Sequence, residues 1–196
     1  MRLKINLDID KLPVKDVVIK TSSVLNKLLG DNNKWHDMVE KPYTSSLISG
    51  GTLQGENIVF NNNAHFYINT EDKEVIRAVL KNKGINFDTP PTKVFSGYNL
   101  LSVKKVRYKT KGKNKWVTPE NSPDFIKYVK NKYGVDIEIY KYDNSVVYYK
   151  RGSKISVSNL LIRTTSSSKD VAKLFQSGIG ASTSIGFGFV EPVNKD

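Results

Sequence analysis

The chain has 196 residues, with 31 Lys or Arg against 19 Asp or Glu, which gives a formal net charge of +12. This excess favours a polyanionic partner, nucleic acid before a membrane surface. The absence of cysteine excludes disulfides, thiolate metal sites and cysteine nucleophiles, and two histidines make a histidine-rich metal site unexpected. The sequence has neither a spanning apolar run nor the apolar core of a signal peptide at its N-terminus. A cytoplasmic protein without metal or cofactor is therefore expected.

The first part of the chain shows the order strand, helix, strands, helix, strand. Alternating apolar residues predict a strand over 2–9, and helical spacing predicts a helix over 15–29 that stops at Gly30. A turn is predicted at Leu12-Pro13. Short strands are predicted over 41–48, 55–60 and 63–69, and a capping sequence at 70–73 predicts a second helix. A strand from about residue 93 to 109 follows the Pro90-Pro91 break.

Residues 91–196 repeat this order. A helix is predicted after Thr118-Pro119, and a hairpin about Asp143-Asn144 joins strands over 135–142 and 145–150. A third strand over 154–163, a helix over 171–176 and a last strand at 187–190 complete the half. Both halves fit a β-α-β-β-α-β pattern, which predicts an α+β fold of two tandem ferredoxin-like domains, residues 1–90 and 91–196. RNA-recognition motifs share this topology, but their aromatic signature is missing here.

A glycine-rich segment lies between the last helix and the last strand. Gly178, Gly180, Gly186 and Gly188 fall within eleven positions, and short hydroxyl side chains stand between them. Glycines allow a ligand or another backbone segment to approach closely, and hydroxyls can donate to a phosphate. The order helix, loop, strand is the reverse of a P-loop or dinucleotide fingerprint. A helix cap followed by a tight turn would explain one or two of these glycines, but not all four.

The segment from Gly178 to Val190 resembles the C-terminal glycine-rich loop of the repeat-associated RNA-binding proteins of CRISPR systems. Within that superfamily the chain is most similar to the endoribonucleases that process CRISPR RNA, the Cas family numbered six. The similarity continues in the first strand with its Leu12-Pro13 end, and in His36 followed by the run Lys41-Pro42-Tyr43-Thr44-Ser45-Ser46-Leu47. It covers nearly the whole chain.

The resemblance implies metal-independent cleavage of repeat RNA to mature guide RNAs. The ribose 2′-hydroxyl attacks the adjacent phosphate and leaves a 2′,3′-cyclic phosphate and a 5′-hydroxyl. By position, His36 is the general acid or base, Lys41 stabilises the phosphorane, and Tyr43 is a weaker third candidate. Imidazoles suit proton transfer because their ordinary pKa of about 6.5 lies near working pH. Family members with a tyrosine, histidine and lysine set carry the tyrosine on the first helix. Here the middle of that helix reads Lys20-Thr21-Ser22-Ser23, so the base is not assigned.

The densest basic run lies between residues 104 and 115, and in a strand every second residue of it would share one face. The residues expected to bind RNA are Lys105, Arg107, Lys109, Lys111, Arg151, Lys154 and Arg163, together with Gly178, Gly180, Ser182, Ser184 and Gly186 of the loop. A solvated loop is the plain alternative for part of the run. Contacts of this kind position RNA without reading its sequence.

CRISPR repeat RNA is the expected partner, and effector-complex subunits or a second copy of the chain are further candidates. Two other functions remain open from the sequence. The chain could be a non-catalytic RNA-binding subunit of an effector complex, or a structural paralogue that has lost RNA binding.

Overall fold

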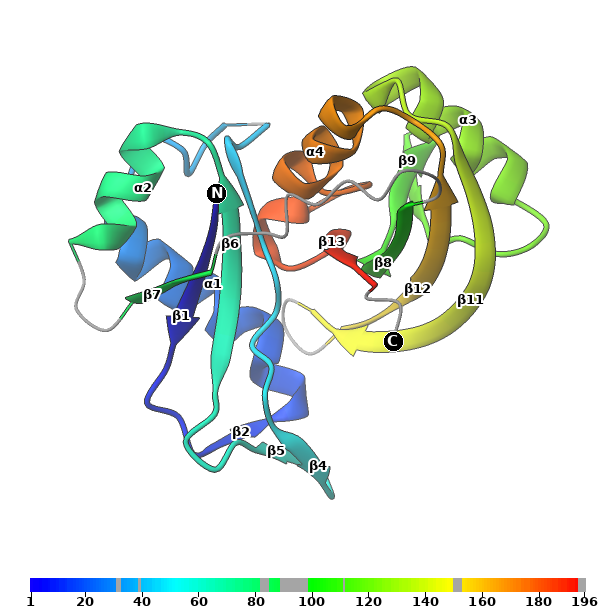
Figure 1. Cartoon of the computed structure of the whole chain (residues 1–196). Coiled ribbons are helices and arrows are strands. Elements are labelled where there is room, and N and C mark those ends of the chain that lie inside the picture. Colours follow the sequence, from blue (N-terminus) through cyan, green and yellow to red (C-terminus); the bar gives the residue numbers. More distant parts are fainter. Residues whose placement is uncertain are drawn as a thin grey trace. The chain divides into compact units, whose positions relative to one another are not determined.

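The computed structural model describes residues 1–30, 33–38, 40–81, 85–88, 99–110, 112–149 and 153–193 (Figure 1). Helices and sheets are mixed, and the chain forms two compact units. The first unit consists of Met1–Pro90, Val147–Ile155 and Ser184–Gly186, and the second of Pro91–Val146, Ser156–Thr183 and Phe187–Asp196. Over the described ranges, no helix has the length and apolar character needed to cross a membrane.

The first unit is built on an antiparallel four-stranded sheet with the order β3-β6-β1-β7. A smaller sheet has the order β2-β5-β4. The elements are β1 (Arg2–Asn6), β2 (Lys11–Pro13), α1 (Val17–Leu29), β3 (Tyr43–Ser45), β4 (Thr52–Gln54), β5 (Asn57–Val59), β6 (His65–Thr70), α2 (Lys73–Leu80) and β7 (Ile85–Asp88). The apolar faces of α1 and α2 share one core with the larger sheet, in which Leu3, Leu25 and Val75 are all buried.

Both helices of the first unit lie where the sequence predicts them, because their ends carry local signals. The Asp72 carboxylate caps α2 by accepting from the amides of Glu74 and Val75. Gly30 ends α1 with a φ of 91°. The turn predicted at Leu12-Pro13 is wrong, since both residues belong to β2 and pair with β5. Pro13 is tolerated there because β2 is an edge strand.

The second unit holds most of the remaining elements, around a sheet with the order β11-β12-β8-β13. They are β8 (Asn99–Val106), β9 (Tyr108–Thr110), β10 (Lys113–Lys115), α3 (Ser122–Tyr133), β11 (Ile137–Tyr148), β12 (Lys154–Thr164), α4 (Ser168–Ser177) and β13 (Phe189–Pro192). The strands β9 and β10 form a separate antiparallel pair. The core joins α3, α4 and the sheet through buried residues such as Phe125, Leu174 and Val103.

The hairpin turn predicted at Asp143-Asn144 is wrong, because β11 runs through both residues. Their side chains bond to β12 instead. Ser158 Oγ donates to Asn144 Oδ1 at 2.8 Å, and Asn159 Nδ2 donates to Asp143 Oδ2 at 3.5 Å. Asp and Asn favour turns by bonding to their own local backbone, and these two residues have cross-strand partners instead. Without the extra turn, and apart from the separate β9-β10 pair, the second half runs strand, helix, strand, strand, helix, strand.

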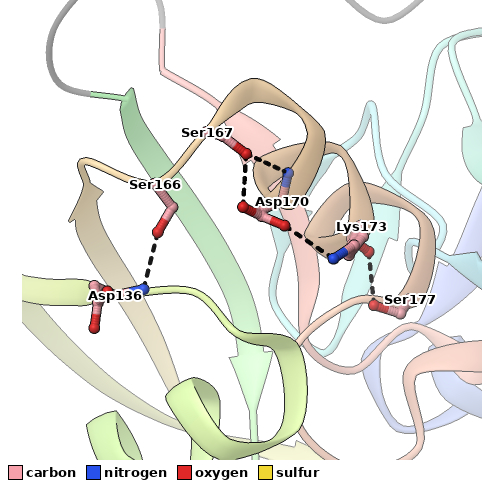
Figure 2. Close-up of polar contacts among 6 residues, drawn as sticks. All are labelled: Asp136, Ser166, Ser167, Asp170, Lys173 and Ser177. Atoms are coloured by element: carbon pink, nitrogen blue, oxygen red, sulfur yellow. Dashed lines mark hydrogen bonds and ion pairs between the residues drawn. The ribbon is translucent and has the colours of Figure 1, made fainter.

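The helix α4 leads directly into the glycine-rich segment, and its start is fixed by a polar cap (Figure 2). Ser167 Oγ accepts from the Asp170 amide at 3.3 Å and donates to the Asp170 carboxylate at 2.6 Å. The same carboxylate accepts from Lys173 Nζ at 2.9 Å. At the other end, Gly178 takes a φ of 66° and its amide donates to Leu174 O. Gly178 therefore ends α4 and marks the start of the glycine-rich segment.

Candidate functional site

His36 lies in a turn that a buried tryptophan anchors in the first unit. Trp35 is 5% exposed and belongs to the core of that unit. The His36 amide donates to Asn33 O at 3.1 Å, and the Met38 amide donates to Trp35 O at 3.3 Å. The His36 side chain is 65% exposed. The turn thus holds an indole inside the protein and presents an imidazole to solvent.

Asp37 orients the imidazole of His36. The distance between His36 Nδ1 and Asp37 Oδ1 is 2.8 Å. An ionised carboxylate can only accept, so Nδ1 carries the proton and donates. This leaves Nε2 for contact with a substrate. Asp37 is 96% exposed, so its pair with His36 contributes little to the free energy of folding. The hydrogen bond nevertheless selects the tautomer of the imidazole. Asp37 was not predicted as a site residue from the sequence, although its position beside His36 was the available signal.

Lys41 is bound to the backbone of the same turn. Its ammonium donates to His36 O at 2.6 Å and also to Trp35 O. Burial lowers the pKa of Lys41, and the nearby Asp37 partly offsets this. An ammonium has three donors, and these two bonds leave one for another acceptor. The structure therefore brings Lys41 and His36 together, with the ammonium holding the turn that carries the imidazole.

The hydroxyls of Tyr43 and of Thr21 on α1 are poor bases. Tyr43 is 3% exposed, and burial raises its pKa to about 12, so it stays protonated at neutral pH. Thr21, in the middle of α1, is fully buried, and its hydroxyl donates to Val17 O and accepts from the Ile48 amide. Neither side chain can readily take a proton from a ribose.

The first part of the glycine-rich segment is clamped inside the second unit. The Ala181 amide donates to Arg107 O at 2.7 Å, and the Gly180 amide donates to Tyr133 Oη at 3.2 Å. Tyr128 Oη donates to Gly180 O at 3.4 Å. A Cβ atom on Gly180 would lie 2.1 Å from Arg107 O, and its φ is 109°. The packing of the protein itself therefore requires glycine at this position.

Gly186 and Ser184 belong to the first unit and pack there in the same way. Ser45 Oγ donates to Ser184 O at 3.0 Å. A Cβ atom on Gly186 would lie 2.4 Å from Leu47 Cδ2. Between the two clamped parts, Ser182 is exposed with a φ of 61°, whereas Gly178 and Gly186 are buried. Ser182 is thus the most accessible of the loop residues expected to bind RNA.

The basic residues after β8 follow a bulge. The register of β8 with β12 shifts so that Lys104 and Lys105 both face Asn159, and Lys105 has a φ of 54°. Asn159 Oδ1 accepts from the Lys105 amide at 2.9 Å. After the bulge, the buried Val106 and Tyr108 alternate with Lys105, Arg107 and Lys109. Burial lowers the pKa of Lys105, and the charge of Lys104 lowers it further.

Arg107 connects this basic run with the glycine-rich segment. Its carbonyl holds Ala181, and its Nη2 donates to Asn114 O at 3.2 Å. Its Nε is buried and has no partner in the described part of the chain. Lys109 is exposed, two residues further along.

Arg163 and Lys154, which are also expected to bind RNA, belong to β12. Arg163 donates to the Glu138 carboxylate through Nε and Nη2, at 3.2 and 2.5 Å, and lies over the Tyr140 ring at 4.8 Å. Its charge is therefore already neutralised. Lys154 is exposed, in the part of β12 that groups with the first unit, and lies 5.5 Å from the Tyr148 ring. Lys111 and Arg151 lie outside the described residues.

Comparison with known proteins identifies the fold. No family model matches the sequence, and a search of curated proteins found no relative. A solved RAMP protein that binds different RNA substrates is 18% identical, with a TM-score of 0.73 over 99% of this chain and 100% of that chain. A CRISPR-associated protein Cas6 is 16% identical, with a TM-score of 0.68 and 99% of both chains covered. A Cas6-related protein from Pyrococcus furiosus is also 16% identical, with a TM-score of 0.67 over 100% of this chain and 99% of that chain.

The chain has the fold of the Cas6 and RAMP proteins. The resemblance noted in the sequence is confirmed at this level. Identities below 20% carry the fold and leave the role of each Cas6-like site residue to experiment.

Proposed function

We propose that this protein is a Cas6-like endoribonuclease of the cytoplasm that cleaves CRISPR repeat RNA without a metal ion. The observation that carries the proposal is the presentation of His36. Its imidazole is exposed on a turn fixed by the buried Trp35 and by the Lys41 ammonium. Nδ1 is held by Asp37, which leaves Nε2 for the reaction.

Each unit is proposed to be a ferredoxin-like domain, with the chain divided near residue 90. The strand order supports this. Counted along the chain, the sheets β3-β6-β1-β7 and β11-β12-β8-β13 both have the order second, third, first, fourth. Each also has two helices packed into the core beside its sheet, which is the β-α-β-β-α-β arrangement. The two short segments that group with the first unit are the exceptions to a division at residue 90.

In the proposed reaction the 2′-oxygen loses its proton and forms a bond to the adjacent phosphorus. The bond from phosphorus to the 5′-oxygen breaks, and that oxygen takes up a proton. His36 Nε2 performs one of these two transfers, which is the work that general acid-base groups do in such reactions. The third donor of Lys41 stabilises the negative charge that develops on the phosphorane. Tyr43 and Thr21 are not proposed for the other transfer, since Tyr43 stays protonated and the Thr21 hydroxyl is already bonded.

A second candidate function is RNA binding without cleavage, as a subunit of a CRISPR effector complex. In either function, a second copy of the chain is a further candidate partner. Three observations favour binding without cleavage. The Lys41 ammonium is engaged with backbone carbonyls, and α1 carries no tyrosine to accompany His36. The structural neighbours also include a RAMP protein that binds different RNA substrates.

Single-turnover cleavage of labelled repeat RNA in EDTA separates these functions. The RNA should carry the CRISPR repeat of the genome that encodes this chain. Cleavage with a 2′,3′-cyclic phosphate on the upstream product, identified by mass spectrometry, is the expected result. Tight binding without cleavage would assign the protein to the second function. A complete lack of repeat-RNA binding would overturn both.

A further inference from the structure

A groove of about 500 Å³ lies between β9 and α3 in the second unit. From α3, the groove is lined by Asp124, Lys127, Tyr128, Asn131 and Lys132. From β9, it is lined by Tyr108, Lys109 and Thr110. The α3 residues recur at helical spacing and share one face of the helix. The adjacent face of the helix, with Phe125 and Val129, is buried in the core. The side of α3 that lines the groove is therefore distinct from the side that packs in the core.

The charge of this groove suits an anion. Three lysines and one aspartate line it, which gives a net charge of +2. Within the described ranges, neither Lys109 nor Lys127 forms an ion pair with a carboxylate. Ammonium groups that gather in one hollow repel one another, and a bound polyanion relieves that repulsion. By contrast, Lys130 of the same helix lies outside the lining and pairs with Asp136.

The uncharged residues of the groove suit a nucleotide better than an acidic peptide. The half-buried Tyr128 ring is held by neighbouring rings, 5.6 Å from Tyr108 and 6.2 Å from Phe125 between centroids. Unpaired RNA bases stack on aromatic side chains of this kind. The amide of Asn131 both donates and accepts, which matches the edge of a base. A volume of about 500 Å³ is also within the usual range of small-ligand sites.

The groove adjoins the glycine-rich segment within the same unit. The Tyr128 hydroxyl donates to Gly180 O at 3.4 Å, so one residue lines the groove and contacts the segment. Lys109 follows Arg107, whose carbonyl holds Ala181. RNA bound along the glycine-rich segment would therefore have a direct path into the groove.

We infer that this groove binds an unpaired nucleotide of the RNA, with its phosphate on Lys109, Lys127 and Lys132 and its base against Tyr128. The inference rests on the proposed RNA-binding function and deepens it. It gives α3 a part in holding single-stranded RNA, separate from the His36 turn that would carry out cleavage.

The test compares Lys127→Ala with Lys130→Ala, which removes the same charge from the same helix outside the groove. Binding of a fluorescein-labelled 15-nucleotide oligouridine RNA is measured by anisotropy over a series of salt concentrations. Lys127→Ala should weaken binding about three- to tenfold and reduce the slope of log affinity against log salt by about 0.7, the contribution of one single-strand phosphate contact. Lys130→Ala should stay within about twofold of the wild type. Photocrosslinking of RNA that contains 4-thiouridine should label the peptide with Tyr128.

The outcomes separate this inference from the proposed function. Equal losses of RNA affinity in Lys127→Ala and Lys130→Ala would show a general effect of charge and would overturn the inference about the groove. Wild-type affinity of Lys127→Ala for RNA, with an unchanged salt slope, would also overturn the inference. In both cases cleavage or binding of repeat RNA by the wild type would leave the proposed function standing. A wild type that binds no RNA would overturn both. Thermal unfolding of each variant checks that the fold is intact.

Discussion

The Lys41 ammonium donates a hydrogen bond to the carbonyl oxygen of His36, with 2.6 Å between the two atoms. A second bond goes to the carbonyl of Trp35, whose side chain is buried in the core of the first unit. The backbone of the candidate catalytic histidine is thus fixed from one side by apolar packing and from the other by a charged group. Substitution of Trp35 or Lys41 should therefore alter cleavage although the imidazole itself is unchanged.

Replacement of the imidazole itself tests the enzyme most directly. His36→Ala should slow cleavage of repeat RNA by roughly 10²- to 10⁴-fold, the usual contribution of a general acid-base group. RNA affinity should stay within a few fold, because the imidazole moves protons and holds little substrate. Single-turnover cleavage in EDTA measures the loss. His65→Ala is the matched control, since His65 lies in β6 with its Nδ1 against Asn63 O. Unchanged cleavage by His36→Ala would remove His36 from the mechanism.

Variants of Lys41 separate its structural role in holding the turn from its electrostatic role in stabilising the phosphorane. Lys41→Met should lower the free energy of unfolding by about 1–2 kcal/mol, because two hydrogen bonds from a charged donor are lost. Cleavage should fall as well. Lys41→Arg keeps the charge and the donors, so it should recover much of the stability measured in urea. If Lys41→Met unfolds like the wild type but cleaves slowly, the contribution of Lys41 is to the phosphorane alone.

The predictions made from sequence held where the signal is local. Helices were placed correctly because amphipathic spacing and end residues such as Asp72 and Gly30 lie within the element itself. The strand through Asp143 and Asn144 was missed because the side chains that hold it extended come from β12, 14 or 16 residues along the chain.

In the candidate site, too, local features could be predicted from sequence and contacts between distant groups could not. A histidine in a polar segment could be singled out from sequence, and the family resemblance paired it with Lys41. The bonds from Lys41 to two backbone carbonyls could not be predicted, because carbonyls are present at every residue and leave no mark in the sequence. The neutralisation of Arg163 was hidden for a related reason, since Glu138 is 25 residues away and contacts it only through strand pairing.

The cap of α4 predicts a particular response of stability to acid. The Ser167 hydroxyl, and after it Lys173, lowers the pKa of Asp170 below its ordinary 3.8. The unfolded chain therefore binds this proton more readily than the folded one. The stabilisation is fully present above the unfolded pKa and is lost as pH falls through the folded pKa. Urea unfolding should show Asp170→Asn less stable than the wild type at pH 7, with the difference shrinking below about pH 4.

Ser167→Ala is the companion variant for the cap. It should lower stability by about 1 kcal/mol at neutral pH, as the loss of an N-cap does. It should also reduce the part of the stability that is lost at acid pH, because the main cause of the lowered Asp170 pKa is removed. A constant difference between Asp170→Asn and the wild type from pH 7 to pH 2 would contradict this assignment.

The glycine-rich segment should respond to substitution even without RNA. In Gly180→Val the new side chain meets Arg107 O, with the first carbon only 2.1 Å away. The backbone must shift, which should cost roughly 3 kcal/mol or more of stability. Urea unfolding of the free protein measures this. Ser182→Ala is the variant that addresses RNA, because its side chain is exposed and should leave stability unchanged. Wild-type stability of Gly180→Val would mean that the clamp on Arg107 is not formed.

The pair formed by Arg163 and Glu138 decides whether Arg163 belongs with the RNA-binding residues. Its guanidinium already donates twice to the carboxylate and lies over the Tyr140 ring. The double variant Glu138→Gln/Arg163→Gln removes both charges and leaves the net charge unchanged. If the pair persists in the complex, the double variant should bind repeat RNA within about twofold of the wild type, since an exposed pair contributes little. Glu138→Gln alone should raise affinity, because it frees the guanidinium for a phosphate, and it should do so more than Glu56→Gln, the same charge change at an exposed site of the first unit. A loss of tenfold or more in the double variant would instead show that Arg163 leaves Glu138 and binds the RNA backbone.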